Sequence, residues 1–144
     1  MAKTLTLPIP QTIKVATCQI LESETETDWK LAYTVSAEGA VVTGLGCVSS
    51  DAEAKNLKIG FDPTGAGGAA IMQIGCVAIP ASSGLNGTVN AVDLLNVTAL
   101  PFLPLDRNEK RIMPLNGGGK LYFSAAAAMT ASAVITITAF IEEY

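Results

Sequence analysis

The chain contains no histidine, and this absence removes the side chain that most often transfers protons near neutral pH. Without histidine there is no Ser-His-Asp or Cys-His relay, and the commonest ligand of transition metals is missing. The three cysteines, Cys18, Cys47 and Cys76, are an odd number and have no CxxC spacing, so we expect neither a full disulfide framework nor a zinc site. Each lies in an apolar run and is expected to be a buried free thiol. These absences predict a protein that is not an enzyme and that carries no metal or other cofactor.

Charge is also scarce, and long hydrophobic runs are absent. Charged residues make up 15% of the chain against about 25% in typical globular proteins. The net charge is −4 and the nine Lys and Arg residues form no basic stripe, so no nucleic-acid partner is expected. No segment approaches the ~20 apolar residues of a membrane span, although hydrophobic residues make up 49% of the chain. Because an isolated monomer rarely exposes large apolar patches, this excess in short segments predicts a homo-oligomer or a larger assembly.

Three segments resemble ligand-binding motifs. Residues 64–68 (TGAGG) and 117–120 (GGGK) are rich in glycine, but the first lacks a following Lys-Ser/Thr and the second opens a strand instead of a helix. We interpret both as turns. The acidic segment 22–28 (ESETETD) could supply oxygen ligands to calcium or could be a solvated loop, and the sequence leaves both readings open.

A period of two residues dominates the rest of the chain and predicts strands. It is visible in residues 29–36, 56–61, 120–124 and 132–141, where apolar and polar or small side chains alternate. Three further runs, residues 12–21, 40–49 and 69–79, are apolar on nearly both faces, as in strands that are central in a sandwich or covered on the outside. Residues 37–39 look like the turn of a tight hairpin, and only residues 89–97 suggest one or two helical turns. With about eight strands in total, we predict an all-β, jelly-roll-like antiparallel β-sandwich.

The chain is expected to form one β-sandwich domain, residues 11–144, preceded by an extended N-terminal arm, residues 1–10. Pro8 and Pro10 favour an extended conformation for this arm. A second proline-rich segment, residues 99–115, is predicted to be an extended crossing segment or a sheet edge. Within it we take Phe102, Leu103 and Leu105 as candidate interface residues, because aromatic and apolar anchors dominate contact energy.

The C-terminal third of the chain, residues 113–144 (MPLNGGGKLYFSAAAAMTASAVITITAFIEEY), resembles the closing hairpin of small head proteins of tailed bacteriophages. Those proteins often end with a proline, a turn, a strand, a stretch of small residues and a long Thr/Ile strand. In size and texture the whole chain resembles phage capsid decoration proteins, also called cement proteins. No signature motif accompanies this resemblance, and no functional residue follows from it.

The resemblance implies a structural virion protein that binds the outside of a capsid as a homotrimer and stabilises the lattice of the major capsid protein. One alternative within the virion is a head-fibre, tail or baseplate accessory protein, although the repeats typical of fibres are absent. A second alternative is a ligand-binding β-sandwich, either lectin-like or a cytokine-like trimer. Neither a nucleic acid nor a membrane is expected as a partner.

Overall fold

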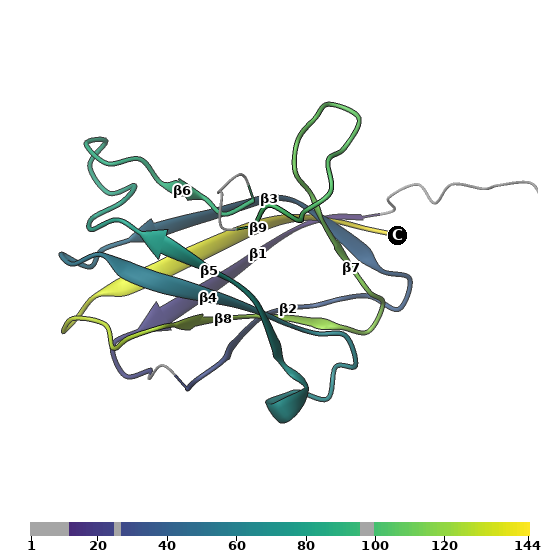
Figure 1. Ribbon diagram of the computed structural model, residues 1–144, viewed down its shortest axis with the longest axis horizontal. Helices are drawn as coiled ribbons and strands as arrows, with labels where there is room; N and C mark the ends of the chain where they lie inside the picture. Colours follow the sequence, from purple (N-terminus) through teal and green to yellow (C-terminus); the bar gives the residue numbers. More distant parts are fainter. Residues whose placement is uncertain (1–11, 25–26, 96–99) are drawn as a thin grey trace, which may run out of the picture.

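The computed structural model describes residues 12–24, 27–95 and 100–144, which form two packed antiparallel sheets (Figure 1). The first sheet has the order β1-β9-β3-β6, with β7 also pairing with β3, and the second has the order β2-β8-β4-β5. A single turn of 3-10 helix, η1, covers Gly68–Ala70. The strands are β1 (Thr12–Leu21), β2 (Lys30–Thr34), β3 (Ala40–Ser49), β4 (Lys55–Asp62), β5 (Met72–Ile79), β6 (Val92–Asp93), β7 (Met113–Leu115), β8 (Lys120–Ala125) and β9 (Val134–Glu143).

The strand pairs follow one another as successive segments of a single long two-stranded ribbon, with β4 and β5 at its closed end. β4 pairs with β5, β3 with β6 and β7, β2 with β8, and β1 with β9. Because this ribbon is rolled up, successive pairs of the nest lie in opposite sheets, which is the jelly-roll arrangement. The predicted all-β sandwich is therefore confirmed; β6 and β7 share the place of one strand, so the described residues contain nine strands instead of eight.

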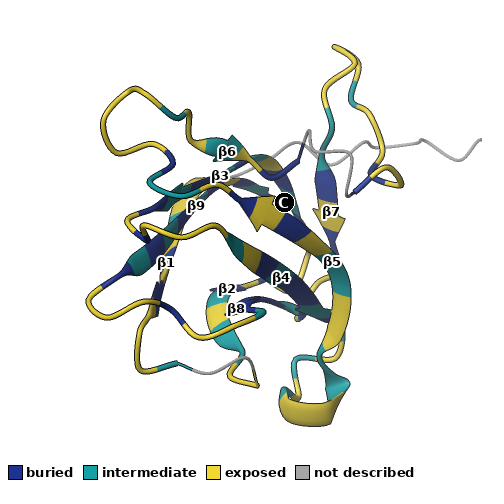
Figure 2. Ribbon diagram, turned by 60° about the vertical axis from the view of Figure 1, so that its left-hand side comes forward, coloured by how far each residue is buried: buried dark blue, intermediate teal, exposed yellow. Residues whose placement is uncertain are grey.

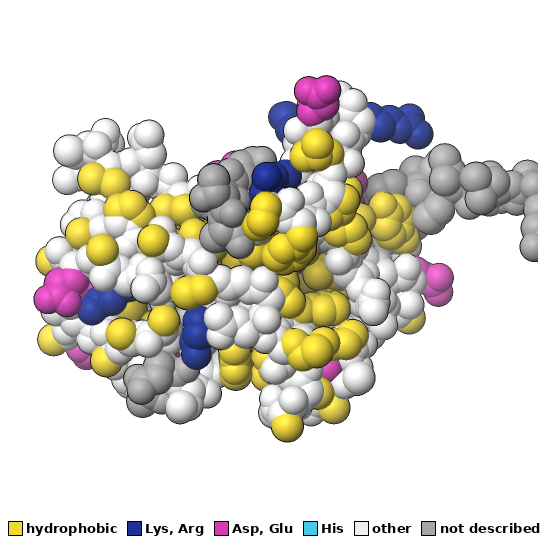
Figure 3. All heavy atoms as spheres, in the orientation of Figure 1, with side chains coloured by type: hydrophobic (Ala, Val, Ile, Leu, Met, Phe, Trp, Pro, Cys, Tyr) yellow, Lys and Arg dark blue, Asp and Glu magenta, His cyan; other side chains and the backbone are white. Residues whose placement is uncertain are grey.

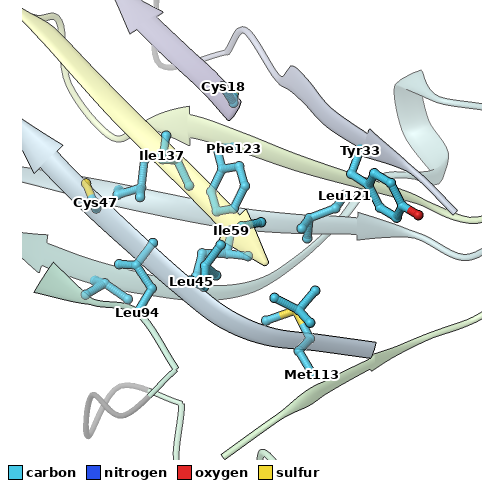
Figure 4. Close-up of a cluster of buried hydrophobic side chains, with 14 of the residues drawn as sticks. Cys18, Tyr33, Leu45, Cys47, Ile59, Leu94, Met113, Leu121, Phe123 and Ile137 are labelled. Carbon is cyan, nitrogen blue, oxygen red and sulfur yellow. The ribbon is translucent and has the colours of Figure 1, made fainter. Parts of the chain in front are cut away.

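The alternation in the sequence sets which side chains face the core. In β9, Ile135, Ile137 and Ile141 point inward and are fully buried, as their spacing predicts. Phe123 of β8 and Ile59 of β4, from the second sheet, pack in the same cluster of buried side chains (Figure 4). Burial of each such side chain stabilises the fold by about 1.5–3 kcal/mol relative to leaving it in water. Figure 2 shows that exposed residues concentrate in the loops and at alternate strand positions.

Three local expectations are corrected by the structure. Residues 29–36 do not form one regular strand, because a bulge between Leu31 and Tyr33 leaves Leu31 47% exposed while Tyr33 is buried. The turn at residues 37–39 joins β2 to β3, which lie in different sheets, so it is not a hairpin. Of residues 89–97, the described part forms β6 and a bend instead of a helix, because the Leu94 N–H binds the Leu45 carbonyl on β3 at 2.8 Å.

Buried carboxylates fix two of the connecting loops. Asp51 accepts hydrogen bonds from Thr130 N (3.0 Å) and Thr130 Oγ1 (2.6 Å), which joins the loop after β3 to the loop before β9. Asp62 accepts hydrogen bonds from Thr64 N (2.8 Å) and Gly67 N (2.6 Å) and closes the turn that the sequence predicts there. The predicted N-terminal arm, residues 1–10, lies outside the described residues. Within the described residues, no helix is long and apolar enough to cross a membrane.

Candidate interaction surface

The outer face of the first sheet, formed by the outward side chains of β1, β9 and β3, presents an apolar surface to solvent. Ile13, Val15 and Phe140 are 77%, 59% and 50% exposed. Val15 pairs with Phe140 across the β1–β9 ladder, so these large side chains are neighbours. On the other side of β9, Phe140 pairs with Gly44 of β3 and lies close above it, where a Cβ atom on Gly44 would be 3.1 Å from Phe140 Cδ2.

This face is also nearly free of charge. The other outward positions of β1, β9 and β3 are occupied by Val, Thr, Gln, Leu and Gly residues. Among the described outward positions of these strands, only Glu142 is charged. When one face of an antiparallel sheet is in contact with water, the side chains on that face are ordinarily polar or charged. An extended, nearly uncharged and partly apolar sheet face is typical of a surface that contacts another protein.

A groove lies over part of this face, between the sheet and the loop that follows β6. Its floor includes Gly44, Gly46 and Phe140, and Lys110 and Arg111 lie on its wall; its volume is about 470 Å³. A second hollow of about 430 Å³ shares Thr43 and Lys110 with it, so the two adjoin. The lining mixes glycine, apolar and charged side chains.

The three interface residues predicted from the sequence occupy different environments. Phe102 and Leu105 are 61% and 58% exposed, whereas Leu103 is buried in the core cluster. Leu105 forms an isolated bridge with Arg111, and Arg111 Nη1 donates to the Leu100 carbonyl at 2.6 Å, which fixes the base of this loop. In Figure 3 this loop rises from the top of the molecule and carries a group of Lys, Arg, Asp and Glu side chains, while hydrophobic side chains are scattered over the side of the molecule that this view shows.

Two of the described carboxylates of the acidic segment 22–28 bind other groups of the protein. Glu22 accepts a hydrogen bond from Ser132 N at 2.5 Å, and Glu24 binds Leu21 N at 2.9 Å and Lys30 Nζ at 2.5 Å. Glu26 lies outside the described residues. Among the residues that the structure describes, no three His, Cys, Asp or Glu side chains are grouped so that they could hold a metal ion.

The cysteines are free thiols in two environments. Cys18 and Cys47 are buried between the sheets, and burial raises the pKa of Cys18 to about 11 and that of Cys47 to about 12. Cys76 is exposed, because it points outward from β5. The sequence suggests three buried thiols, and for Cys76 that expectation is wrong: all three runs look equally apolar, and only the register shows which face is covered.

One polar cluster joins the two sheets beside the start of β1. Tyr33 of β2 donates its hydroxyl to Glu143 of β9, and Lys14 of β1 forms an ion pair with the same carboxylate at 2.9 Å. The hydrogen bond from Tyr33, followed by the one from Lys14, lowers the pKa of Glu143 below its usual value. Burial, and secondarily this hydrogen bond, raises the pKa of Tyr33, so its hydroxyl remains a donor. The cluster is a structural link between sheets.

Comparison with known proteins gives one informative likeness. No protein-family profile matches the chain, and no curated protein matches it by sequence. A chain of the solved structure described as "Cyanophage Pam1 capsid asymmetric unit" has a similar fold, with a TM-score of 0.52 and 14% sequence identity. The likeness covers 100% of this chain and 94% of that chain. At this identity it shows that the two chains share a fold.

Sequence reasoning missed the outer face of the first sheet as a candidate surface. The run in residues 12–21 was expected to be central in a sandwich or covered on its outer side, but within the part of the chain that the structure describes β1 pairs only with β9, and Ile13 and Val15 are exposed. The near absence of charge in residues 12–21 and 134–141 was the available signal. It could not be assigned to one surface until the structure placed β1 next to β9.

Proposed function

We propose that this chain is a structural virion protein that binds the outside of a tailed-phage capsid and reinforces the lattice of the major capsid protein, as a cement or decoration protein. The observation that carries the proposal is the full-length fold likeness to a chain of a phage capsid structure. The resemblance of the C-terminal third to small phage head proteins points the same way. The proposal includes a homotrimer on the capsid surface and no catalytic activity.

The described surface supports this role. A protein that reinforces a lattice needs an extended contact face instead of a pocket for chemistry, and the outer face of the first sheet offers an uncharged area anchored by Val15 and Phe140. Aromatic side chains that are half-exposed in the free protein are typical anchors of protein interfaces. The charged loop at residues 104–112 would form a polar rim beside this face.

The first experiment compares particles that contain the protein with particles from a phage in which its gene is interrupted. We expect capsids to assemble in both cases, and particles without the protein to release their genome at lower temperature and after milder osmotic shock. Equal survival of the two particle types would contradict the proposal. Labelling of the protein on the tail or a fibre, instead of on the head, would favour an accessory role there.

A matched pair of variants tests the surface. Phe140→Lys places a charge at the centre of the outer face, whereas Leu85→Lys changes a side chain of similar exposure (52%) in the loop between β5 and β6. Added back to particles that lack the protein, Phe140→Lys should bind at least tenfold more weakly than Leu85→Lys. Equal binding of the two variants would exclude the outer face of the first sheet as the capsid contact.

A further inference from the structure

The edges of the two sheets are unequal in how they are protected against pairing with another chain. β2 is short and carries a bulge, and β6 has two residues. β7 has three residues, and one of them is Pro114. β5 has a register shift opposite β4, and Leu100 packs against its Gly75. Bulges, prolines and short strands are the usual devices that block edge pairing.

β1 has none of these devices. It runs for 10 residues, pairs with β9 without any register shift and contains no proline. Its single charged side chain, Lys14, is held by Glu143. Within the described residues, β1 pairs only on its β9 side, so its other edge is a long template for an added strand.

The hydrogen-bonding direction of this edge follows from the neighbouring strands. The carbonyls of Val134 and Phe140 on β9 accept hydrogen bonds from Ser50 and Thr43 of the β3 side. In a strand, the N–H and C=O of one residue point to the same side and those of the next residue to the other. The even-numbered residues of β9 therefore face β3, and its odd-numbered residues face β1.

In the β1–β9 pairing, the odd-numbered residues of β9 lie opposite the even-numbered residues of β1, so the even-numbered residues of β1 hydrogen-bond to β9. The backbone N–H and C=O groups on the free edge therefore belong to Ile13, Val15, Thr17 and Gln19. The end of the strand agrees with this direction. Leu21, which has the same parity, binds Glu24 through both backbone groups, with Leu21 N to Glu24 Oε2 at 2.9 Å and Glu24 N to the Leu21 carbonyl at 3.1 Å. The open template is thus the stretch 13–19.

The sequence of residues 5–11 (LTLPIPQ) suits a strand that pairs on one side only. Proline has no N–H, and Pro8 and Pro10 are two residues apart, so in an extended chain both missing donors belong to the same side. The residues of the other parity, Leu5, Leu7, Ile9 and Gln11, keep every donor on the opposite side. Such a segment can add to an edge and then offers no good template to a further strand.

This segment is poorly suited to fold back onto the β1 strand of its own chain. Thr12 is the first described residue of β1, and a two-residue hairpin placed directly before it would have Pro10 and Gln11 at its centre. The turns that close such hairpins need a positive φ at the first central position, whereas the ring of Pro10 fixes φ near −65°. A longer turn centred on Ile9 and Pro10 is also disfavoured, because proline restricts the residue before it.

We propose that residues 5–11 of one copy add as a strand to the free edge of β1, residues 13–19, of a neighbouring copy. The two stretches match in length, about 23 Å each in extended conformation. Repeated from copy to copy, the exchange is head-to-tail, an arrangement that gives a ring when the rotation between neighbouring copies closes and a filament when it does not. The inference goes beyond the proposed function, since it concerns how copies join to one another and holds in the absence of any capsid.

The test is a pair of proline substitutions in residues 5–11, measured as the mass of the purified full chain by light scattering over a range of concentrations. Leu7→Pro removes a donor aimed at the neighbour, whereas Thr6→Pro removes one aimed away from it. We expect the unmodified chain and Thr6→Pro to form the same oligomer. Leu7→Pro, and deletion of residues 1–10, should assemble at least tenfold more weakly and approach the monomer mass of 14.9 kDa.

Two further variants complete the test. Leu7→Ala loses the side chain but keeps the N–H, so it should assemble better than Leu7→Pro. Thr17→Pro removes a donor on the edge itself and should weaken assembly while the β-sheet circular dichroism is unchanged. An unmodified chain that is monomeric, or an oligomer that survives both Leu7→Pro and the deletion, would overturn the proposal. Capsid binding is scored separately on particles, so failure of one proposal does not decide the other.

Discussion

The hydrogen bond from Tyr33 to Glu143 gives a sharp test of how the two sheets are joined. Tyr33 lies on β2 of the second sheet and Glu143 on β9 of the first, and both are buried. In Figure 4 the Tyr33 hydroxyl points away from the hydrophobic cluster. Tyr33→Phe removes only this hydroxyl, so it leaves the packing of the ring in place and deprives a buried carboxylate of one of its two donors.

The expected magnitude follows from the charge on the acceptor. A hydrogen bond to an ionised group contributes about 1.5–3 kcal/mol to stability, against about 1 kcal/mol for a neutral pair. We therefore expect Tyr33→Phe to lower the free energy of unfolding by about 2 kcal/mol at pH 7. With a urea dependence of about 1–3 kcal/mol/M for a small domain, the unfolding midpoint should fall by roughly 1 M.

The pH dependence provides an independent check. The folded-state pKa of Glu143 lies below its unfolded value, so the stability that its partners give is fully present above the unfolded value of about 4.3 and is lost as pH falls through the folded pKa. The difference between the wild-type protein and Tyr33→Phe should therefore be constant from pH 7 to 5 and shrink towards pH 3. Tyr33 itself stays protonated over this range, because its pKa is raised.

The control is Lys14→Met, which removes the second partner of the same carboxylate. Because the Lys14 side chain is half-exposed, its ion pair is screened by solvent and this change should lower the free energy of unfolding by less than about 1 kcal/mol. An effect of Tyr33→Phe below that of Lys14→Met, or one that is the same at pH 7 and pH 3, would refute the account of this cluster.

Three further outcomes are expected. Phe123→Ala should lower the free energy of unfolding by about 3–5 kcal/mol in urea titrations, because the side chain is fully buried between the sheets; a loss below 1 kcal/mol would contradict this packing. In native protein a thiol reagent should label Cys76 rapidly and Cys18 and Cys47 only after unfolding, and mass mapping of the labelled peptides would show any departure. Asp62→Asn should flatten the loss of stability between pH 5 and 3, because hydrogen bonds from Gly67 and Thr64 hold the pKa of Asp62 below its usual value; an unchanged pH profile would argue against that role.

The sequence predicted the inward faces of several strands because side-chain alternation is a local property. Apolar residues separated by an even number of positions are buried as expected, both in β9 (Ile135, Ile137 and Ile141) and in β4 (Leu57 and Ile59). The prediction failed at Leu31, where a bulge reverses the alternation. A bulge depends on the partner strand as well as on the residues that form it, so period counting within residues 29–36 could not detect it.

The candidate surface could be predicted only in outline. A scarcity of charge and an excess of apolar residues indicated an exposed apolar patch somewhere, and Phe102 and Leu105 are indeed exposed. Leu103, which lies between Phe102 and Leu105 in the sequence, is buried, because its side chain packs into the hydrophobic core. The pairing of Val15 with Phe140 could not be predicted from the sequence, since it joins residues near opposite ends of the chain.

Taken alone, the sequence determined that the fold is built from strands, because periodicity and β-branched content act within a few residues of one another. It also determined that no histidine-dependent chemistry is present. Only the tertiary structure decided which strands are neighbours. It shows that β1, among the described residues, pairs on one side only, and that Phe140 lies over Gly44 on the outer face of the first sheet. The physical reason is that strand pairing joins residues far apart in the chain, and neither the order of strands in a sheet nor the identity of its edge is encoded in local alternation.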